Sequence, residues 1–355
     1  MSPALTLRAG PDALKVIRER GLRAEDVDVI PGASGGAKWL SIAGLDRYLF
    51  GELLQEPRTR PLHLIGSSIG SWRMACLAQR DPLAALDRGH TAYIYEQVYP
   101  PKPSAVEVTR VLGGALDTML GPNGAAEILE HPWARVHVIT ARGRWLAASR
   151  RRMALMAGLA IAAAGNLLSR RTLGWQLQRV IFHSCGDETP FAHLADLPTV
   201  HLPLTKENAR DALLASGSIP LLLEGVRVRG APPGGIYWDG GVLDYHLDLD
   251  FGAGAGLVLY PHFYSHVVPG WFDKSLPWRR APARNFRRTL LLAPTDEFVA
   301  SLPGGKIPDR RDFYGIPDRE RMRRWQAVRE ASEQLGDELR ELVTTGRIAD
   351  RVQPW

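Results

Sequence analysis

The sequence predicts an α/β protein built around a mainly parallel sheet. Short apolar runs alternate along the 355-residue chain with longer segments of helical pattern, and strands separated by helices are typical of parallel sheets. Apolar residues make up 45% of the chain and charged residues 23%, which is an ordinary balance for a globular protein. The length favours one elaborated domain over two large ones.

The expected strands are short apolar runs bounded by turns. The first of them leads into the loop PGASGGAKWL at 31–40, and a helix is expected over about 38–54. Beyond about residue 270 the chain is rich in proline and arginine and looks irregular until a charged helix near 318–343. The expected strands are 27–30, 60–66, 135–141, 179–185, 256–262 and 289–295.

Charge is distributed unevenly along the chain, whose formal net charge is +6. From His131 to Gly186 there is no acidic residue but there are nine arginines, and a second acid-free run, Lys274 to Arg288, carries six basic residues. Basic patches attract anionic partners such as phospholipid headgroups, acidic substrates or nucleic acid. No pattern of a nucleic-acid-binding module is present, so no nucleic acid is expected as a partner.

The segment RRRMALMAGLAIAAAGNLLSRR, residues 150–171, is unusually apolar. Its sixteen residues from Met153 to Leu168 carry no charge, whereas a membrane span needs about 20 apolar residues. Two interpretations stay open. The segment is either a buried alanine-rich helix, or an interfacial helix or lid whose flanking arginines meet phospholipid headgroups.

The N-terminal segment has neither the layout nor the cleavage site of a secretory signal. The only cysteines, Cys76 and Cys185, belong to no CxxC pair, so neither a disulfide framework nor a zinc knuckle is implied. The expected location is the cytoplasm, with peripheral membrane contact as an extension of that expectation.

The glycine-rich loop at 31–40 suggests either phosphate binding or oxyanion binding. A P-loop needs GxxxxGK followed by Ser or Thr, but here Lys38 precedes Trp39 and the glycine spacing differs. Gly32, Gly35 and Gly36 also fail the GxGxxG spacing of dinucleotide sites. Nucleotide binding is therefore disfavoured, and oxyanion binding remains.

A second glycine turn carries a candidate nucleophile. Residues 66–70, GSSIG, match GxSxG between an expected strand and a helical segment, the context in which this motif presents its serine, here Ser68. Two general bases are open: Asp239, which precedes two glycines, or a histidine of a Ser–Asp–His triad, for which His262 and His266 are candidates.

Three motifs in this order resemble the patatin-like phospholipases. They are the loop Ser34-Gly35-Gly36-Ala37-Lys38, the GxSxG turn and Asp239-Gly240-Gly241, with ALLASGSIPLLLEG (212–225) before the aspartate. The resemblance spans about residues 25–262, with Ser34 and Trp39 departing from the residues usual in the family. It implies a three-layer α/β/α fold and a Ser–Asp dyad that cleaves lipid acyl esters without a histidine. No cofactor or metal is expected.

The resemblance assigns a role to each matching position. Ser68 would be the nucleophile and Asp239 the base, and Lys38 would shape the loop or bind a lipid headgroup. Residues 1–270 would form the catalytic domain with a basic apolar insert at about 142–171, and 271–355 an Arg/Pro-rich extension packed on it. The backbone amides expected to bind the oxyanion are those of Gly35, Gly36 and Ala37.

The expected function is therefore a lipid acyl hydrolase, a phospholipase A or lysophospholipase-like esterase, with an acyl-enzyme on Ser68. Its expected partners are a phospholipid or other lipid acyl ester and an anionic membrane surface. Two alternatives remain: an α/β-hydrolase-like esterase with a histidine-containing triad, and a non-catalytic lipid-binding protein on a hydrolase scaffold.

Overall fold

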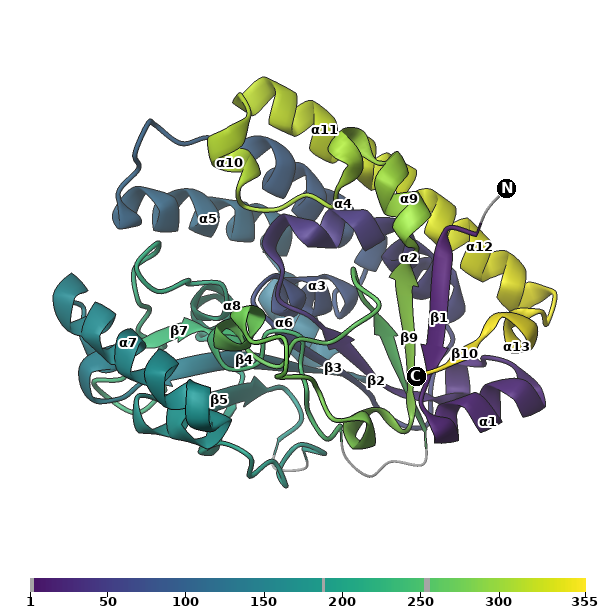
Figure 1. Cartoon of the computed structure of the whole chain (residues 1–355), viewed down its shortest axis with the longest axis horizontal. Coiled ribbons are helices and arrows are strands. Elements are labelled where there is room, and N and C mark those ends of the chain that lie inside the picture. The colour runs from purple at the N-terminus through teal and green to yellow at the C-terminus, as the bar shows by residue number, and fades with distance from the viewer. Residues whose placement is uncertain (1–2, 187–188, 252–255) are drawn as a thin grey trace.

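The computed structural model describes residues 3–186, 189–251 and 256–355. Helices cover both faces of a ten-stranded sheet (Figure 1), which confirms the predicted three-layer α/β/α architecture. The strands are β1 (Leu5–Ala9), β2 (Val27–Gly32), β3 (Leu62–Ser67), β4 (Ala134–Gly143), β5 (Leu177–His183), β6 (Thr199–Pro203), β7 (Tyr237–Asp239), β8 (Leu257–Pro261), β9 (Thr289–Pro294) and β10 (Gln353–Pro354).

The sheet is mainly parallel, as predicted. Its order is β10-β1-β9-β8-β2-β3-β4-β5-β6, with β7 paired to β4. The central strands β8, β2 and β3 run parallel to their neighbours on both sides. The strand β4 is parallel to β3 but antiparallel to β5 and β7, and β1–β9 is a further antiparallel pair. Every residue of β2 is buried, Asp28 included, and its mainly apolar composition is typical of a strand that is covered on both faces.

The helices form the two outer layers of the fold. In Figure 1, α4, α5 and α11 lie above the sheet, while α7 lies at the lower left, beside β5 and β7. The helices are α1 (Pro11–Arg20), α2 (Ala43–Tyr48), α3 (Ile69–Leu77), α4 (Pro82–Thr91), α5 (Ala105–Leu120), α6 (Gly124–Glu130), α7 (Arg152–Leu168), α8 (Ala209–Ser216), α9 (Asp296–Ser301), α10 (Asp312–Gly315), α11 (Asp318–Ala331), α12 (Glu333–Thr344) and α13 (Ile348–Arg351).

Two expected helices are divided in the structure. The segment expected over about 38–54 consists of a 3₁₀ turn, η2 (Gly36–Ile42), then α2, then a π-helical turn, η3 (Leu49–Leu53). The charged helix near 318–343 is the pair α11 and α12, separated at Ser332. Ser332 Oγ accepts a hydrogen bond from Gly44 N at 3.0 Å, and a side chain on Gly44 would collide with the Ser332 carbonyl. The break between α11 and α12 thus seats α2 against them.

Buried apolar residues form two clusters. The larger one surrounds the sheet and extends from Ala4 to Val352. The smaller one lies under α7, where Leu155 and Ala162 pack against a set that includes Trp238 and Val242. The expected buried helix at 150–171 is therefore buried along one face only. In the described part of the chain, no helix is both long and apolar enough to cross a membrane.

Candidate active site

Ser68 occupies a tight turn between β3 and α3. Its backbone has φ 56° and ψ −131°, a conformation that costs energy for a residue with a side chain and is concentrated at functional sites. A side chain on Gly70 would collide with the Gly32 carbonyl, and one on Gly66 would collide with Gly70. The two glycines of the GxSxG motif thus allow the turn to lie directly against β2, as a nucleophile elbow requires.

The Ser68 hydroxyl is directed at Asp239. Ser68 Oγ donates a hydrogen bond of 2.7 Å to Asp239 Oδ2, and the second carboxylate oxygen, Oδ1, accepts from Gly241 N at 2.7 Å. The Asp239 backbone amide donates to Ser218 O at 2.9 Å. The structure therefore brings the predicted nucleophile and the predicted base into direct contact, with the carboxylate fixed from both sides.

Burial sets the acidity of Asp239. Desolvation raises the pKa of its carboxyl from 3.8 to about 6, against the opposing effects of the Ser68 and Gly241 hydrogen bonds and of the positive charges on Lys274 and Arg310. A buried carboxylate with this pKa is ionised at neutral pH, yet it is a much stronger base than an exposed aspartate. This is the property that a general base needs.

The two glycines after Asp239 permit close packing. A side chain on Gly240 would collide with the Ile139 carbonyl of β4, and one on Gly241 would collide with the Ser34 side chain. Ser34 itself donates to Ser67 Oγ at 3.0 Å. Ser34, which departs from the family's usual residue, therefore joins the oxyanion loop to the strand before the nucleophile.

The predicted oxyanion loop lies between β2 and η2. Gly36 has φ 56°, a conformation that favours glycine. The first backbone bond of η2 runs from Lys38 N to Gly35 O at 3.4 Å, so the amides of Gly36 and Ala37 precede its hydrogen-bond ladder. The pairing of Gly32 with Gly66 in the β2–β3 register places this loop next to the nucleophile turn.

Ser216, at the end of α8, is a site residue that the sequence analysis did not single out. Its Oγ accepts from Ser68 N at 2.9 Å and donates to Ile139 O at 2.6 Å. The Ser68 amide is thereby already hydrogen-bonded. The segment ALLASGSIPLLLEG contains this serine, and its likeness to the family's Ala-Ser segment was the available signal.

Tyr245 and Lys274 are two further residues that the motifs did not reveal. Tyr245 O accepts from Ser34 N at 2.8 Å, and Lys274 Nζ lies 3.6 Å from the centre of the Tyr245 ring. Partial desolvation, together with the charges of Lys38 and Arg310, lowers the pKa of Lys274 to about 7. Burial also lowers the pKa of Lys38. Lys274 is thus close enough to Lys38, Arg310 and Asp239 for their charges to act on one another.

The histidines of the alternative triad are engaged elsewhere. His262 is buried, its Nδ1 accepts from Tyr264 N at 2.9 Å, and burial lowers its pKa to about 3. His266 stacks on Tyr264 with ring centres 5.2 Å apart. Within the described residues, neither histidine forms a hydrogen bond with Ser68, whose hydroxyl donates to Asp239.

Known proteins show where this arrangement belongs. A model of the patatin-like phospholipase family matches residues 33–246, a span that contains the glycine loop, the GxSxG turn and the Asp-Gly-Gly turn. No curated protein matches the chain. The family consists of lipid acyl hydrolases with an α/β fold, and its model covers more than half of this sequence. This chain therefore belongs to the patatin-like phospholipase family.

Proposed function

We propose that the protein is a serine esterase that cleaves fatty acyl esters of phospholipids or lysophospholipids, with Ser68 and Asp239 as a catalytic dyad. The observation that carries this proposal is the 2.7 Å hydrogen bond from Ser68 Oγ to a buried carboxylate. Nucleophilic catalysis by serine needs a base within hydrogen-bond reach, and that base in turn needs a third group to orient it. Gly241 N is the orienting group here.

Acylation would begin with attack of Ser68 Oγ on the ester carbonyl carbon. The hydroxyl proton passes to Asp239 Oδ2, and the carbonyl oxygen becomes an oxyanion. The amides of Gly35, Gly36 and Ala37 are the proposed donors to this oxygen, since preorganised amides stabilise the charge that develops there. The tetrahedral intermediate then breaks its bond to the alcohol oxygen, which takes the proton from Asp239 and leaves an acyl-enzyme on Ser68.

Deacylation would use the same groups with water. Asp239 accepts a proton from a water molecule as that water attacks the acyl carbonyl, and the loop amides again bind the oxyanion. Collapse of this intermediate releases the fatty acid, and the proton on Asp239 returns to Ser68 Oγ. Because the pKa of Asp239 lies at about 6, the carboxyl can accept and release this proton at neutral pH.

Family membership favours lipid esters as substrates, and charge favours an anionic headgroup. Lys38, Lys274 and Arg310 all lie near enough to influence one another's charge or that of Asp239. Lys274 and Arg310 come from the segment 271–355, so this part of the chain would complete the site built by residues 1–270. Lys38 would then contact the headgroup rather than only shape the loop.

The first test is release of fatty acid from a mixed lipid extract, identified by mass spectrometry. The wild-type protein is expected to release fatty acids, and Ser68→Ala to release none. Ser301→Ala, which changes a serine on α9, is the matched control and should behave as wild type. A fluorophosphonate probe should label the wild type and the control but not Ser68→Ala. A folded wild-type protein that neither labels nor releases fatty acid would instead be a non-catalytic lipid binder.

The second test separates the dyad from the histidine triad. Under the dyad, His262→Ala and His266→Ala retain turnover in whatever fraction of the protein folds, because neither ring contacts Ser68. Turnover is normalised to the folded fraction, measured by circular dichroism. Loss of turnover by a folded histidine variant, together with survival of turnover in Asp239→Asn, would overturn the dyad.

A further inference from the structure

The outer face of α7 exposes an unusual number of large apolar side chains. Leu168 is 86% exposed, Trp145 79% and Met153 75%, although burying such side chains is the main driving force of folding. We call the following set the α7 surface. Its residues are Trp145 and Leu146 of the 3₁₀ turn η5 (Trp145–Ala148), Met153, Met156, Ile161, Leu167 and Leu168 of α7, and Trp175 of the 3₁₀ turn η6 (Arg170–Trp175).

The turns η5 and η6, which carry three of these side chains, both lie against α7. A side chain on Gly158 of α7 would lie 2.7 Å from Ala147 N of η5, and one on Gly165 would lie 2.6 Å from Thr172 Oγ1 of η6. Both turns therefore pack directly against the helix. The inward face of α7 is a separate stripe of Leu155, Gly158, Ala162 and Asn166 at three- and four-residue spacing. The apolar side chains on the exposed face therefore do not pack into the hydrophobic core.

Arginines without acidic partners surround this apolar face. Arg151 and Arg171 are exposed, and Arg144, Arg150 and Arg152 donate only to backbone carbonyls, those of Gly174, Gly225 and Leu221. In the described part of the chain none of these five forms an ion pair with a carboxylate. Elsewhere exposed arginines do pair, as Arg340 does with Glu52. The apolar α7 surface is therefore bordered by arginines whose positive charge no carboxylate of the described residues balances.

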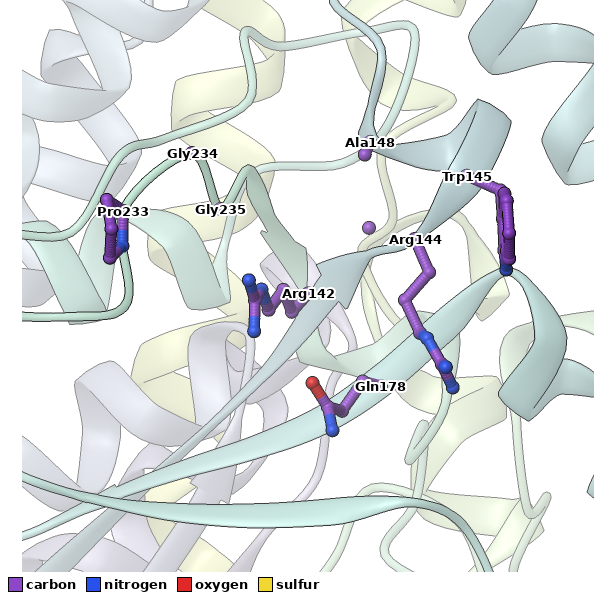
Figure 2. Close-up of a pocket in the computed structure, with 9 residues that line it drawn as sticks. Arg142, Arg144, Trp145, Ala148, Gln178, Pro233, Gly234 and Gly235 are labelled. Atoms are coloured by element: carbon purple, nitrogen blue, oxygen red, sulfur yellow. The ribbon is translucent and has the colours of Figure 1, made fainter.

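A hollow of about 390 Å³ opens beside the α7 surface (Figure 2) and is separate from the Ser68 site. Arg142, Arg144, Trp145 and Gln178 line it together with the loop 233–235. The Arg142 side chain forms no hydrogen bond or ion pair within the described residues. Near it, the buried hydroxyl of Tyr237 has no hydrogen-bond partner among the described residues either. An unpaired guanidinium at such a hollow is suited to an anion.

We propose that the α7 surface docks on an anionic phospholipid bilayer, with its apolar side chains at the boundary between headgroups and acyl chains and one lipid phosphate in the hollow between Arg142 and Arg144. Helices that lie in a membrane interface combine apolar residues with basic ones in this way, and tryptophan prefers this depth. Arginine suits the phosphate because its planar group donates paired hydrogen bonds.

Charge argues against a second copy of this chain as the occupant. A twofold-symmetric contact brings the same patch of each subunit together, so the unpaired arginines of one copy would face those of the other. Nucleic acid would satisfy the arginines but not the apolar centre of the surface. A bilayer with anionic lipids matches both features.

The α7 surface is tied structurally to the proposed active site. The cluster under α7 contains Trp238 and Val242, on either side of Asp239. The buried carboxylate of Asp273 accepts from Asn166 of α7 at 2.7 Å and from Arg170, and the next residue is Lys274, above Tyr245. The docking itself does not depend on catalysis; only the idea that docked lipid supplies the substrate rests on the proposed function.

The test measures flotation of the full-length Ser68→Ala protein with vesicles, so that lipid is not consumed. Vesicles of phosphatidylcholine alone are compared with vesicles that also contain phosphatidylglycerol, across a salt series. Binding is expected only with phosphatidylglycerol and is expected to fall as salt rises. In the same background, the pair Arg151→Gln and Arg171→Gln should weaken binding about tenfold or more. The pair Arg18→Gln and Arg110→Gln removes the same charge from α1 and α5 and should have little effect.

Two more variants test the parts of the surface. Leu168→Ser with Trp145→Ser should weaken binding about tenfold or more, because both side chains would leave the interface. Arg142→Gln should weaken binding to the phosphatidylglycerol vesicles about fivefold, the effect of one arginine near the membrane surface. Thermal melting checks that each variant folds, and hydrolysis of a soluble monomeric ester by otherwise wild-type protein should be unchanged.

Binding that is equal for both vesicle types and insensitive to salt would overturn the proposal. So would a loss of binding in the Arg18 and Arg110 control pair as large as the loss in the Arg151 and Arg171 pair. Self-association that Leu168→Ser abolishes would assign the surface to a second copy instead. Wild-type binding by Arg142→Gln would refute the phosphate site in the hollow. If vesicles bind as expected but the wild-type protein hydrolyses no ester, the docking stands and the proposed function fails.

Discussion

The region around Ser68 and the α7 surface use similar apolar residues in opposite ways. Around Ser68 the apolar side chains are buried and the loops touch at glycine contacts that leave no room for a side chain. On α7, Leu155 is 3% exposed and Leu168 86% exposed, although both belong to one helix. Burial in the first region stabilises the fold and holds Ser68 against Asp239, whereas exposure in the second stabilises nothing in the isolated chain.

A buried ion pair strengthens the contrast. Arg73 of α3 donates to both carboxylate oxygens of Asp46 of α2, at 2.6 and 2.9 Å. The helix α3 follows the nucleophile turn, and α2 follows the oxyanion loop through η2. The pair therefore joins the helix that follows the Ser68 turn to the helix that follows the glycine-rich loop. The arginines around the α7 surface have no such partner.

The largest effect on activity is expected from Asp239→Asn, which removes the base while keeping the size of the side chain. Turnover should fall by at least about 10³-fold, as it does when triad members are removed from serine enzymes. Initial rates on a soluble ester measure this, with the folded fraction determined in parallel. Turnover within tenfold of wild type would show that another group serves as the base.

The same substitution should stabilise the fold at neutral pH. The Asp239 carboxyl has a pKa of 3.8 when unfolded and about 6 when folded, so the folded state binds more protons between these values. The free energy of unfolding therefore falls as the pH rises from about 4 to 6, and above pH 6 it stays at the lower value. Asparagine avoids this cost, which is up to about 3 kcal/mol. Thermal melting should show a gain at pH 7 that shrinks toward pH 4.

The largest loss of stability is expected from Arg73→Met. It leaves the Asp46 carboxylate buried without a partner, which costs about 3–5 kcal/mol. Adding Asp46→Leu should restore much of the loss, because a buried ion pair can be replaced by apolar residues. Denaturant unfolding of both single variants and of the double variant measures the coupling. Additive losses would mean that the pair contributes little to the contact between α2 and α3.

Activity should also fall at acidic pH. The base must be ionised, so kcat/KM for a soluble ester should fall about tenfold per pH unit below about 6. Rates in overlapping buffers, with stability checked at each pH, give the profile. An acid limb near 4 would mean that Asp239 is solvated like an ordinary aspartate.

The smallest effect is expected on the α7 surface. Leu168→Ser should change the free energy of unfolding by no more than about 0.5 kcal/mol, since the side chain is already in water. Leu155→Ala on the same helix should cost about 2–5 kcal/mol. Denaturant unfolding compares the two. A large loss at Leu168 would show that the side chain packs against protein in solution, against the docking proposal.

The fold was largely predictable because most of its strands are short, mainly apolar runs bounded by turns. All six expected strands are present with small shifts at their ends, and the motif order predicted both Ser68 and Asp239 as neighbours. The strands β1, β6, β7 and β10 were missed for physical reasons. β7 and β10 have three and two residues, β6 is only partly buried, and β1 is a run of five residues in which the polar Thr6 and Arg8 interrupt the apolar ones. Too short or too polar a segment carries no periodic signal.

The remaining site residues could not be predicted because they act through tertiary contacts. Ser216 lies 148 positions after Ser68 and supports its backbone rather than joining a motif. Lys274 reaches the site from beyond the family match, over the Tyr245 ring. The two-sided character of α7 was also hidden, because the residues of both faces are apolar and only packing distinguishes Leu155 from Leu168.

Asp273 has a consequence for how the membrane experiments can be interpreted. Its fully buried carboxylate is the common acceptor for Asn166 and Arg170, with Arg279 3.7 Å away. Dissolved ions screen exposed charges strongly and buried ones weakly. Added salt would therefore leave the C-terminal half of α7 fastened to the body of the protein while it weakens the attraction of the outer arginines for lipid. A salt titration would then report adhesion alone, free of any change in the shape of the adhering surface.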